Sequence, residues 1–143
     1  MLQVIIDTSE QRPWAFPAAD FETRRKKLRE GDYTLVGAVG RLSIERKSLG
    51  DFVGTVIHDW LRFRKELIRL SGYDVAAVVV EADIGDVIDH KYESDANPDS
   101  VLGKANGIYL DHGIPVLWWG KRPGVERMAA RFLKLAAAKL GIE

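Results

Sequence analysis

Acidic and basic residues recur in two short segments of the chain at spacings that suit hydrolysis of a phosphodiester. Gly31-Asp32-Tyr33 introduces an apolar run typical of a strand, and Glu45-Arg46-Lys47 closes a second run of this kind. Because side chains alternate between the two faces of a strand, Glu45 and Lys47 are expected on one face. A carboxylate and an ammonium group that face another acid form a combination that a metal-dependent nuclease needs.

Five acids are candidate ligands for the divalent cation of such a site: Asp7, Glu10, Asp32, Glu45 and Asp51. Mg²⁺ activates a water and offsets charge on the phosphate when a few carboxylates hold it and leave water on it. If the strands next to Asp32 and Glu45 are neighbours, these two acids can face one ion. Lys47 is then placed to orient the water or to stabilise developing charge.

The same residues also have plain structural interpretations. An Asp in a Gly-Asp-Tyr sequence is most often a turn residue, and Glu45 and Lys47 could form a surface ion pair. Asp51 could simply cap a helix that starts at Ser48, and Asp7 could end a strand. Spacing alone does not decide between these interpretations and a nuclease site.

The elements that must position these residues are strands and helices in alternation. Apolar and β-branched runs predict strands over 2–7, 33–36, 41–47, 75–81 and 114–119. The basic run within 23–28 fits either an exposed helix or an edge strand, because its period does not distinguish them.

Helices are predicted by apolar residues at intervals of three and four and by their end signals. One long helix is expected from Ser48 to Leu70, and another from Asn97-Pro98 to His112, where Gly113 ends it. A final helix runs from Pro123-Gly124 to about Leu140, and 84–94 is expected to be a short helix or loop. This order predicts a single-domain α/β fold with a mixed central sheet flanked by helices.

Composition sets wider limits. The chain has 143 residues, which suits one domain, and its 21 basic and 21 acidic residues balance. Residues 1–70 carry 13 Lys and Arg against 10 Asp and Glu, so the segment with the motifs is mildly basic. The lack of cysteine excludes disulfides and Cys-ligated zinc. No apolar stretch suits a signal peptide or a membrane span, so we expect a soluble, intracellular (cytoplasmic) protein with no membrane partner.

The motifs together resemble those of a known family. Glu45-Arg46-Lys47, three residues and Asp51 form the pattern ERKxxxD, which resembles the signature of the XPF-type structure-specific endonucleases, whose core is restriction-endonuclease-like. Gly31-Asp32-Tyr33 resembles the GD-aromatic motif of that family. Similar segments follow in chain order over nearly the whole sequence: 5–10 with two acids three residues apart, Arg62 to Glu66, Val78 to Glu81, Asn97-Pro98, and Gly113 to Val116. The last two resemble the prokaryotic and phage branch.

The resemblance implies roles for individual residues. Asp32 and Glu45 would be ligands of Mg²⁺ or Mn²⁺, with Lys47 as the catalytic lysine, and Asp7 and Glu10 would complete the acidic cluster. Arg46 and Asp51 belong to the signature without an assigned role. Arg46 should point away from Glu45 and Lys47 on a regular strand and would brace the site. The resemblance also implies that 23–28 is a strand.

Two basic groups are candidates for contact with DNA phosphates. The first lies in 24–29 and consists of Arg24, Arg25, Lys26, Lys27 and Arg29. The second lies on the long predicted helix and consists of Arg62, Arg64, Lys65 and Arg69. Either group could instead be a solvated face. Arg62 is favoured because it also matches the family.

The resemblance further implies a metal-dependent DNA endonuclease that acts on branched, forked or flap DNA with single-strand/double-strand junctions, in repair or recombination. It implies a homodimer through the C-terminal helices, and an enzyme associated with the nucleoid when bound to DNA. No tandem helix-hairpin-helix domain fits after Leu140, so residues 1–143 are expected to be a stand-alone nuclease domain. The alternatives are a catalytically inactive DNA-binding or dimerisation module, which usually loses acids that this chain retains, and an unrelated enzyme that shares the spacing by chance.

Overall fold

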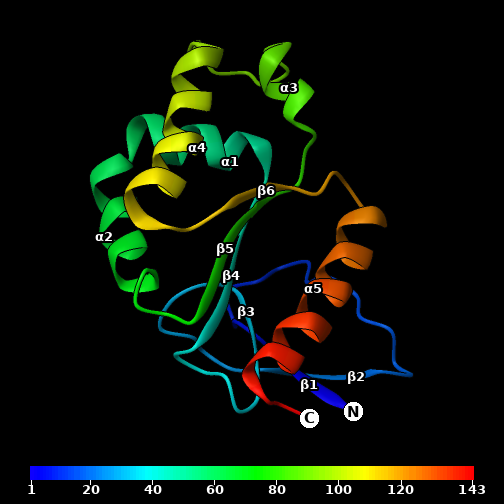
Figure 1. Cartoon of the computed structure of the whole chain (residues 1–143). Helices are drawn as coiled ribbons and strands as arrows, with labels where there is room; N and C mark the ends of the chain where they lie inside the picture. Colours follow the sequence, from blue (N-terminus) through cyan, green and yellow to red (C-terminus); the bar gives the residue numbers. More distant parts are fainter.

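Six strands form one mixed sheet in the computed structural model, which describes residues 1–143 (Figure 1). The strands are β1 (Leu2–Ile6), β2 (Phe21–Arg25), β3 (Tyr33–Leu35), β4 (Leu42–Lys47), β5 (Val75–Val80) and β6 (Val116–Trp118). Their order across the sheet is β2-β1-β3-β4-β5-β6. The β3 strand runs antiparallel to both β1 and β4, whereas β4, β5 and β6 are parallel to one another.

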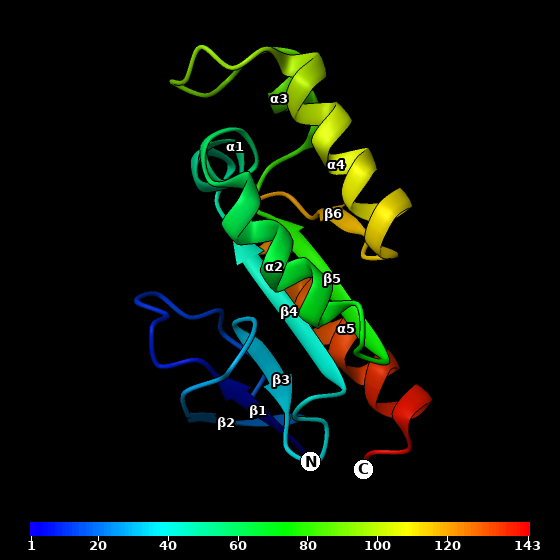
Figure 2. The ribbon, with the colours of Figure 1, turned by 90° about the vertical axis from the view of Figure 1, so that its left-hand side faces the viewer.

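Helices cover both faces of this sheet (Figures 1 and 2). They are α1 (Leu49–His58), α2 (Trp60–Leu70), α3 (Ile84–Ile88), α4 (Pro98–His112) and α5 (Gly124–Leu140). The α5 helix packs on one face against Val4, Tyr33 and Ile44. The α1, α2 and α4 helices pack on the other face against Val78 and Val80. The predicted α/β fold, a mixed sheet flanked by helices in one domain, is confirmed. None of the helices is long and apolar enough to cross a membrane.

The prediction of one long helix from Ser48 to Leu70 is wrong, because the chain forms two helices that meet at Asp59. The backbone of Asp59 leaves the helical region, with φ −116° and ψ 27°. Buried Val56 and Phe63 keep a helical spacing across the break, so the apolar period could not reveal it. In Figure 2, α1 is seen nearly end-on while α2 runs along the strands. The bend therefore lets α2 lie lengthwise beside β4 and β5.

Other boundaries differ by a few residues. The strand expected over 23–28 is found at Phe21–Arg25, on the edge of the sheet, where four of its five side chains are exposed. The chain then leaves the sheet, and Leu28 is buried as its N–H donates to Asp7 Oδ1 at 2.7 Å. The α4 helix begins after Asn97, whose side chain accepts from the Asp99 N–H at 2.8 Å, and it ends at Gly113, as predicted.

The β4 strand positions the residues of chemical interest. Leu42 and Ile44 point to the α5 face and are buried in its core. The alternate residues Ser43, Glu45 and Lys47 therefore point to the α2 face. Since β4 has β3 on one side and β5 on the other, side chains near its carboxyl end can meet groups from both neighbours.

Candidate active site

Asp32, Glu45 and Lys47 come together on the α2 face of the sheet. Asp32 directly precedes β3, which pairs with β4 through Tyr33 and Ile44. The Asp32 Oδ2 atom accepts the Arg46 N–H at 2.7 Å, so its carboxylate lies against β4. Lys47 Nζ lies 3.5 Å from Glu45 Oε2. The antiparallel pairing of β3 and β4 thus makes neighbours of two acids that lie 13 residues apart in sequence.

A further acid, Glu66 of α2, joins this cluster. Its side chain lies near the Glu45 carboxyl, and its charge acts on both Glu45 and Asp32. On the same helix, the Phe63 ring lies 5.4 Å from Lys47 Nζ in a cation–π contact. Sequence reasoning did not place Glu66 in the site, although the segment from Arg62 to Glu66 was part of the family resemblance. The apolar pattern does not reveal the bend at Asp59, so the sequence did not indicate that Glu66 approaches β4.

The carboxyl groups of Asp32 and Glu45 resist ionisation. Burial, followed by the charges of Asp32 and Glu66, raises the pKa of Glu45 well above its usual range. Burial also raises the pKa of Asp32 to about 7, although the Arg46 N–H opposes this shift. Glu45 is only 8% exposed. Three neighbouring acids with a single nearby lysine therefore leave an excess of negative charge that a bound cation would relieve.

The donor atoms suit a hard divalent cation. No group of three or more His, Cys, Asp or Glu side chains is arranged to hold a metal ion. Mg²⁺, however, usually binds through one or two carboxylates and keeps several waters. The carboxylates of Asp32 and Glu45 supply such a pair of oxygen donors. The residues present thus fit Mg²⁺ or Mn²⁺ better than zinc, which favours nitrogen and sulfur ligands.

Asp7 and Glu10 make other contacts. Asp7 accepts the N–H groups of Leu28 and Ser9 at 2.7 and 3.1 Å. Burial opposes ionisation of Asp7, but these hydrogen bonds outweigh it and lower its pKa. Glu10 forms an ion pair with Arg46 at 3.0 Å. Neither side chain makes a direct contact with Glu45 or Lys47, although the charge of Glu10 contributes to the raised pKa of Asp32.

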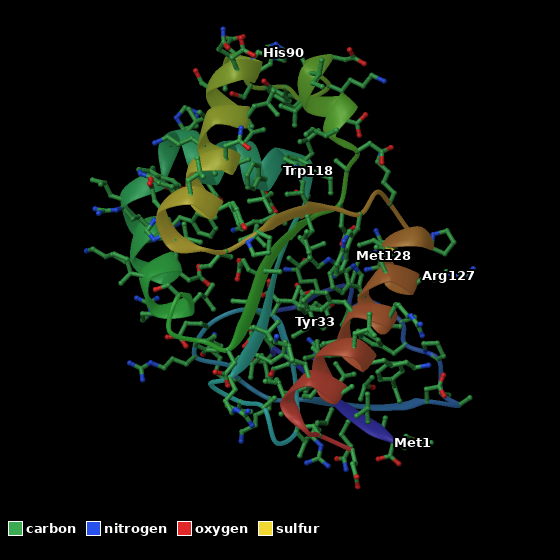
Figure 3. The ribbon with its side chains drawn as sticks, in the orientation of Figure 1. Met1, Tyr33, His90, Trp118, Arg127 and Met128 are labelled. Atoms are coloured by element: carbon green, nitrogen blue, oxygen red, sulfur yellow. The ribbon has the colours of Figure 1, made fainter.

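Arg46 lies on the opposite face from Glu45 and Lys47. Its guanidinium pairs with Glu81 and Glu10 and lies 5.1 Å from the centre of the Trp14 ring. It also donates to the Tyr33 hydroxyl and to the Arg12 carbonyl, at 3.2 and 2.8 Å. We call Arg46, Glu10, Glu81, Trp14 and Tyr33 the arginine network. Tyr33 lies between the sheet and α5 (Figure 3).

Asp51, the last acid of the ERKxxxD pattern, is exposed in the first turn of α1. Its N–H donates to Ser48 Oγ at 3.2 Å, which caps the helix. Its position near the end of β4 leaves both a helix-capping and a catalytic role compatible with the geometry.

The two basic groups are on the surface, and some of their members have acidic partners. Arg62 pairs with Asp59 at 3.6 Å, while Arg64 and Lys65 are exposed on α2. On β2, Arg24 donates to Gln3 Oε1 and Arg25 to the carbonyls of Thr8 and Glu10. Lys26 is exposed just beyond β2.

Known structures share this fold. The structure is similar to XPF from Aeropyrum pernix, with a TM-score of 0.73 and 21% identity over 94% of this chain and 61% of that chain. It is also similar to XPF from Aeropyrum pernix in complex with DNA, with a TM-score of 0.72 and 19% identity over 97% of this chain and 66% of that chain. No curated protein matches the sequence. The fold is thus that of an XPF-type nuclease domain.

Residues 6–131 match the sequence profile of the ERCC4 domain. Since this match covers most of the chain, the protein belongs to the ERCC4 domain family, and the resemblance to XPF-type nucleases is confirmed. The chain spans about two thirds or less of the archaeal XPF chains that it resembles.

Proposed function

We propose that this chain is a divalent-metal-dependent endodeoxyribonuclease that hydrolyses phosphodiester bonds, with residues 1–143 as its nuclease domain. The observation that carries the proposal is the cluster of Asp32, Glu45 and Lys47 on adjacent strands, in which burial and mutual repulsion raise the pKa values of both acids. Membership of the ERCC4 domain family and a similar XPF structure in complex with DNA support it.

Each residue of the cluster has a distinct task in this proposal. Asp32 and Glu45 would hold Mg²⁺ or Mn²⁺, which supplies Lewis acidity and lowers the pKa of a bound water. Lys47, beside Glu45 and above the Phe63 ring, orients the attacking water or stabilises negative charge that develops on the phosphate. Burial of Glu45 strengthens these electrostatic effects, because the local dielectric is low.

Branched, forked or flap DNA with single-strand/double-strand junctions is the proposed substrate, inside the cell during repair or recombination. The exposed basic side chains of α2 and of the β2 region would contact its backbone: Arg62, Arg64, Lys65, Arg24, Arg25 and Lys26. A homodimer through the C-terminal helices is proposed as well. Met128 and Leu135, one heptad apart on α5, are 47% and 59% exposed and support it.

A cleavage assay tests the main proposal. The protein is incubated with fork, flap and duplex DNA in Mg²⁺ or Mn²⁺, beside a Glu45→Ala variant. Cleavage by the parent that EDTA and the variant both abolish is the expected result. Tight DNA binding without cleavage under either metal would instead establish the alternative, a catalytically inactive DNA-binding or dimerisation module.

Light scattering tests the dimer. Leu135→Glu should convert a dimer to a monomer, whereas Leu61→Glu on α2, where the leucine is 75% exposed, should leave the mass unchanged. A parent that is already a monomer at micromolar concentration would contradict this part of the proposal.

A further inference from the structure

Glu30 is a buried carboxylate outside the acidic cluster, and several side chains converge on it. Only 4% of its side chain is exposed. Its Oε1 accepts from Arg69 Nε at 3.0 Å and its Oε2 from the Tyr73 hydroxyl at 2.6 Å, while Arg29 Nε lies 3.5 Å away. A carboxylate buried to this degree is tolerated only when it is paired and hydrogen-bonded.

The two side chains that hydrogen-bond to Glu30 belong to the far end of the helix that carries Glu66. Arg69 lies in the last turn of α2, one turn beyond Glu66, and Tyr73 follows the helix end. The contacts to Glu30 therefore fasten the carboxyl end of α2 to the segment before β3. A cleft of about 420 Å³ adjoins these side chains, so water can solvate the Glu30 carboxylate if Arg69 or Tyr73 is removed.

The segment that Glu30 anchors leads directly to Asp32. Gly31, between them, has φ +75°, and a Cβ there would lie 1.9 Å from Ser43 Oγ, so the chain passes tightly against β4. Ser43 Oγ donates to the Glu30 carbonyl at 3.5 Å, and the Asp32 N–H donates to the Ile44 carbonyl at 2.8 Å. Glu30 and Asp32 thus lie two residues apart on one short segment that is held against β4.

We propose that Glu30 is a positioning residue which, through Arg69 and Tyr73, holds α2 against the Asp32 segment and so sets the spacing of the carboxylates of Asp32, Glu45 and Glu66. The inference rests on the proposed function, since it concerns the geometry of the same site. It also gives Arg69 a structural task in place of a contact with DNA phosphate.

The test compares Glu30→Ala, Glu30→Gln and Tyr73→Phe in the full chain. We expect Glu30→Ala to lower the single-turnover cleavage rate about tenfold or more, as loss of a residue that orients metal ligands typically does. The DNA concentration at half-saturation should stay close to that of the parent. Glu30→Gln retains the shape and an acceptor oxygen and should restore most of the rate, and Tyr73→Phe should lie between them.

Direct binding of Mn²⁺, followed by electron paramagnetic resonance without DNA, gives a second measurement. Glu30→Ala should bind Mn²⁺ about tenfold more weakly than the parent. Asp74→Ala is the matched control, because it removes a carboxylate that pairs with Arg41 at 2.9 Å at the opposite end of β4. That control should leave both the cleavage rate and the affinity for Mn²⁺ unchanged.

A double-mutant cycle separates positioning from DNA contact. If Arg69 acts through Glu30, the Glu30→Ala/Arg69→Ala variant cuts no more slowly than the slower single variant. Should Arg69 contact phosphate instead, Arg69→Ala alone raises the DNA concentration at half-saturation, and this overturns its assigned role.

The outcomes also separate this inference from the proposed function. If the variants fold, bind Mn²⁺ and cut DNA as the parent does, the inference about Glu30 is wrong and the proposed function is unaffected. A parent that binds Mn²⁺ but cuts no DNA overturns the function, while the Mn²⁺ affinity of the variants still decides the role of Glu30. If Glu30→Ala fails to fold, Tyr73→Phe decides it, and a cleavage rate and an affinity for Mn²⁺ equal to those of the parent count against the proposal.

Discussion

The charged side chains on the two faces of β4 have opposite surroundings. Carboxylates surround a cation on one face, and other acids surround a carboxyl group on the other. On the α5 face, Arg46 meets the carboxylates of Glu10 and Glu81, a phenol and a carbonyl. On the α2 face, Glu45 meets two further acids and one ammonium group, from Lys47. Consecutive residues of one motif thus belong to two environments, because a strand alternates its side chains.

This difference suggests a division of labour within Glu45-Arg46-Lys47. A network in which a central cation lies between two carboxylates and each charged group has an opposite or hydrogen-bonding partner stabilises the fold in one arrangement and has little need of a ligand. A cluster with excess negative charge destabilises the protein until a cation or a proton enters it. The arginine network should therefore matter for stability, and the acidic cluster for catalysis.

The largest expected effect is on the acidic side. Lys47→Ala should lower the cleavage rate about 10²–10³-fold, as removal of one group that stabilises the transition state typically does. DNA affinity and thermal stability should change far less, because Lys47 is partly exposed. Single-turnover cleavage and equilibrium DNA binding measure the two effects. Lys139→Ala, an exposed lysine near the end of α5, is the control. Normal cutting by Lys47→Ala would remove this residue from the mechanism.

The next effect is on the opposite face. Arg46→Ala leaves Glu10 and Glu81 without their partner, and we expect it to lower the free energy of unfolding by about 2–3 kcal/mol, since both acids are largely buried. Urea unfolding measures the loss. Arg41→Ala breaks the exposed pair with Asp74 and should cost less than about 1 kcal/mol. If Arg46→Ala is as stable as Arg41→Ala, the division of labour is wrong.

The dependence of stability on pH gives a third contrast. The pKa of Asp32 is raised from 3.8 to about 7 in the folded protein. The stability that the folded protein gains by holding Asp32 protonated is therefore fully present below the pKa of Asp32 in the unfolded chain. This stability is lost as the pH rises through about 7. Without metal, the free energy of unfolding should fall by about 2–3 kcal/mol between pH 5 and pH 8.

Mg²⁺ should reverse this loss, and by more at pH 8 than at pH 5, because protons compete with the metal for the carboxylates. Asp32→Asn should flatten the pH dependence and weaken the response to Mg²⁺. Urea unfolding at several pH values, with and without EDTA, measures both. If the stability of the parent rises from pH 5 to pH 8 without metal, ionisation of the acidic cluster does not destabilise the folded protein.

Much of this contrast could be predicted from the sequence. The alternation of β4 places Glu45 and Lys47 on one face by a local rule, and the strand runs and end signals give the mixed α/β fold. Asn97 and Gly113 delimit α4 because capping depends on residues next to each other in sequence. The proximity of Asp32 to Glu45 followed only from the assumption that their strands are neighbours.

The remaining features depend on contacts between distant segments. Glu66 reaches Glu45 because of the bend at Asp59, which the apolar period conceals. Glu10 pairs with Arg46 across 36 positions, and Trp14 donates to Glu81 across 67, and no local pattern specifies either partner. The resemblance grouped Asp7 and Glu10 with the acidic cluster, but no local pattern indicated that Glu10 pairs with Arg46.

The smallest predicted effect refines the view of the arginine network. The Tyr33 hydroxyl accepts the backbone N–H of Trp14 at 2.9 Å and the Arg46 guanidinium at 3.2 Å. Tyr33→Phe keeps the ring, which stacks on Trp14 with centroids 4.6 Å apart, but leaves that N–H without an acceptor. We expect a loss of about 1 kcal/mol in unfolding free energy. The cleavage rate should stay near that of the parent, because the hydroxyl lies on the face opposite Glu45. A large drop in cleavage rate at unchanged stability would show that the two faces of β4 are coupled.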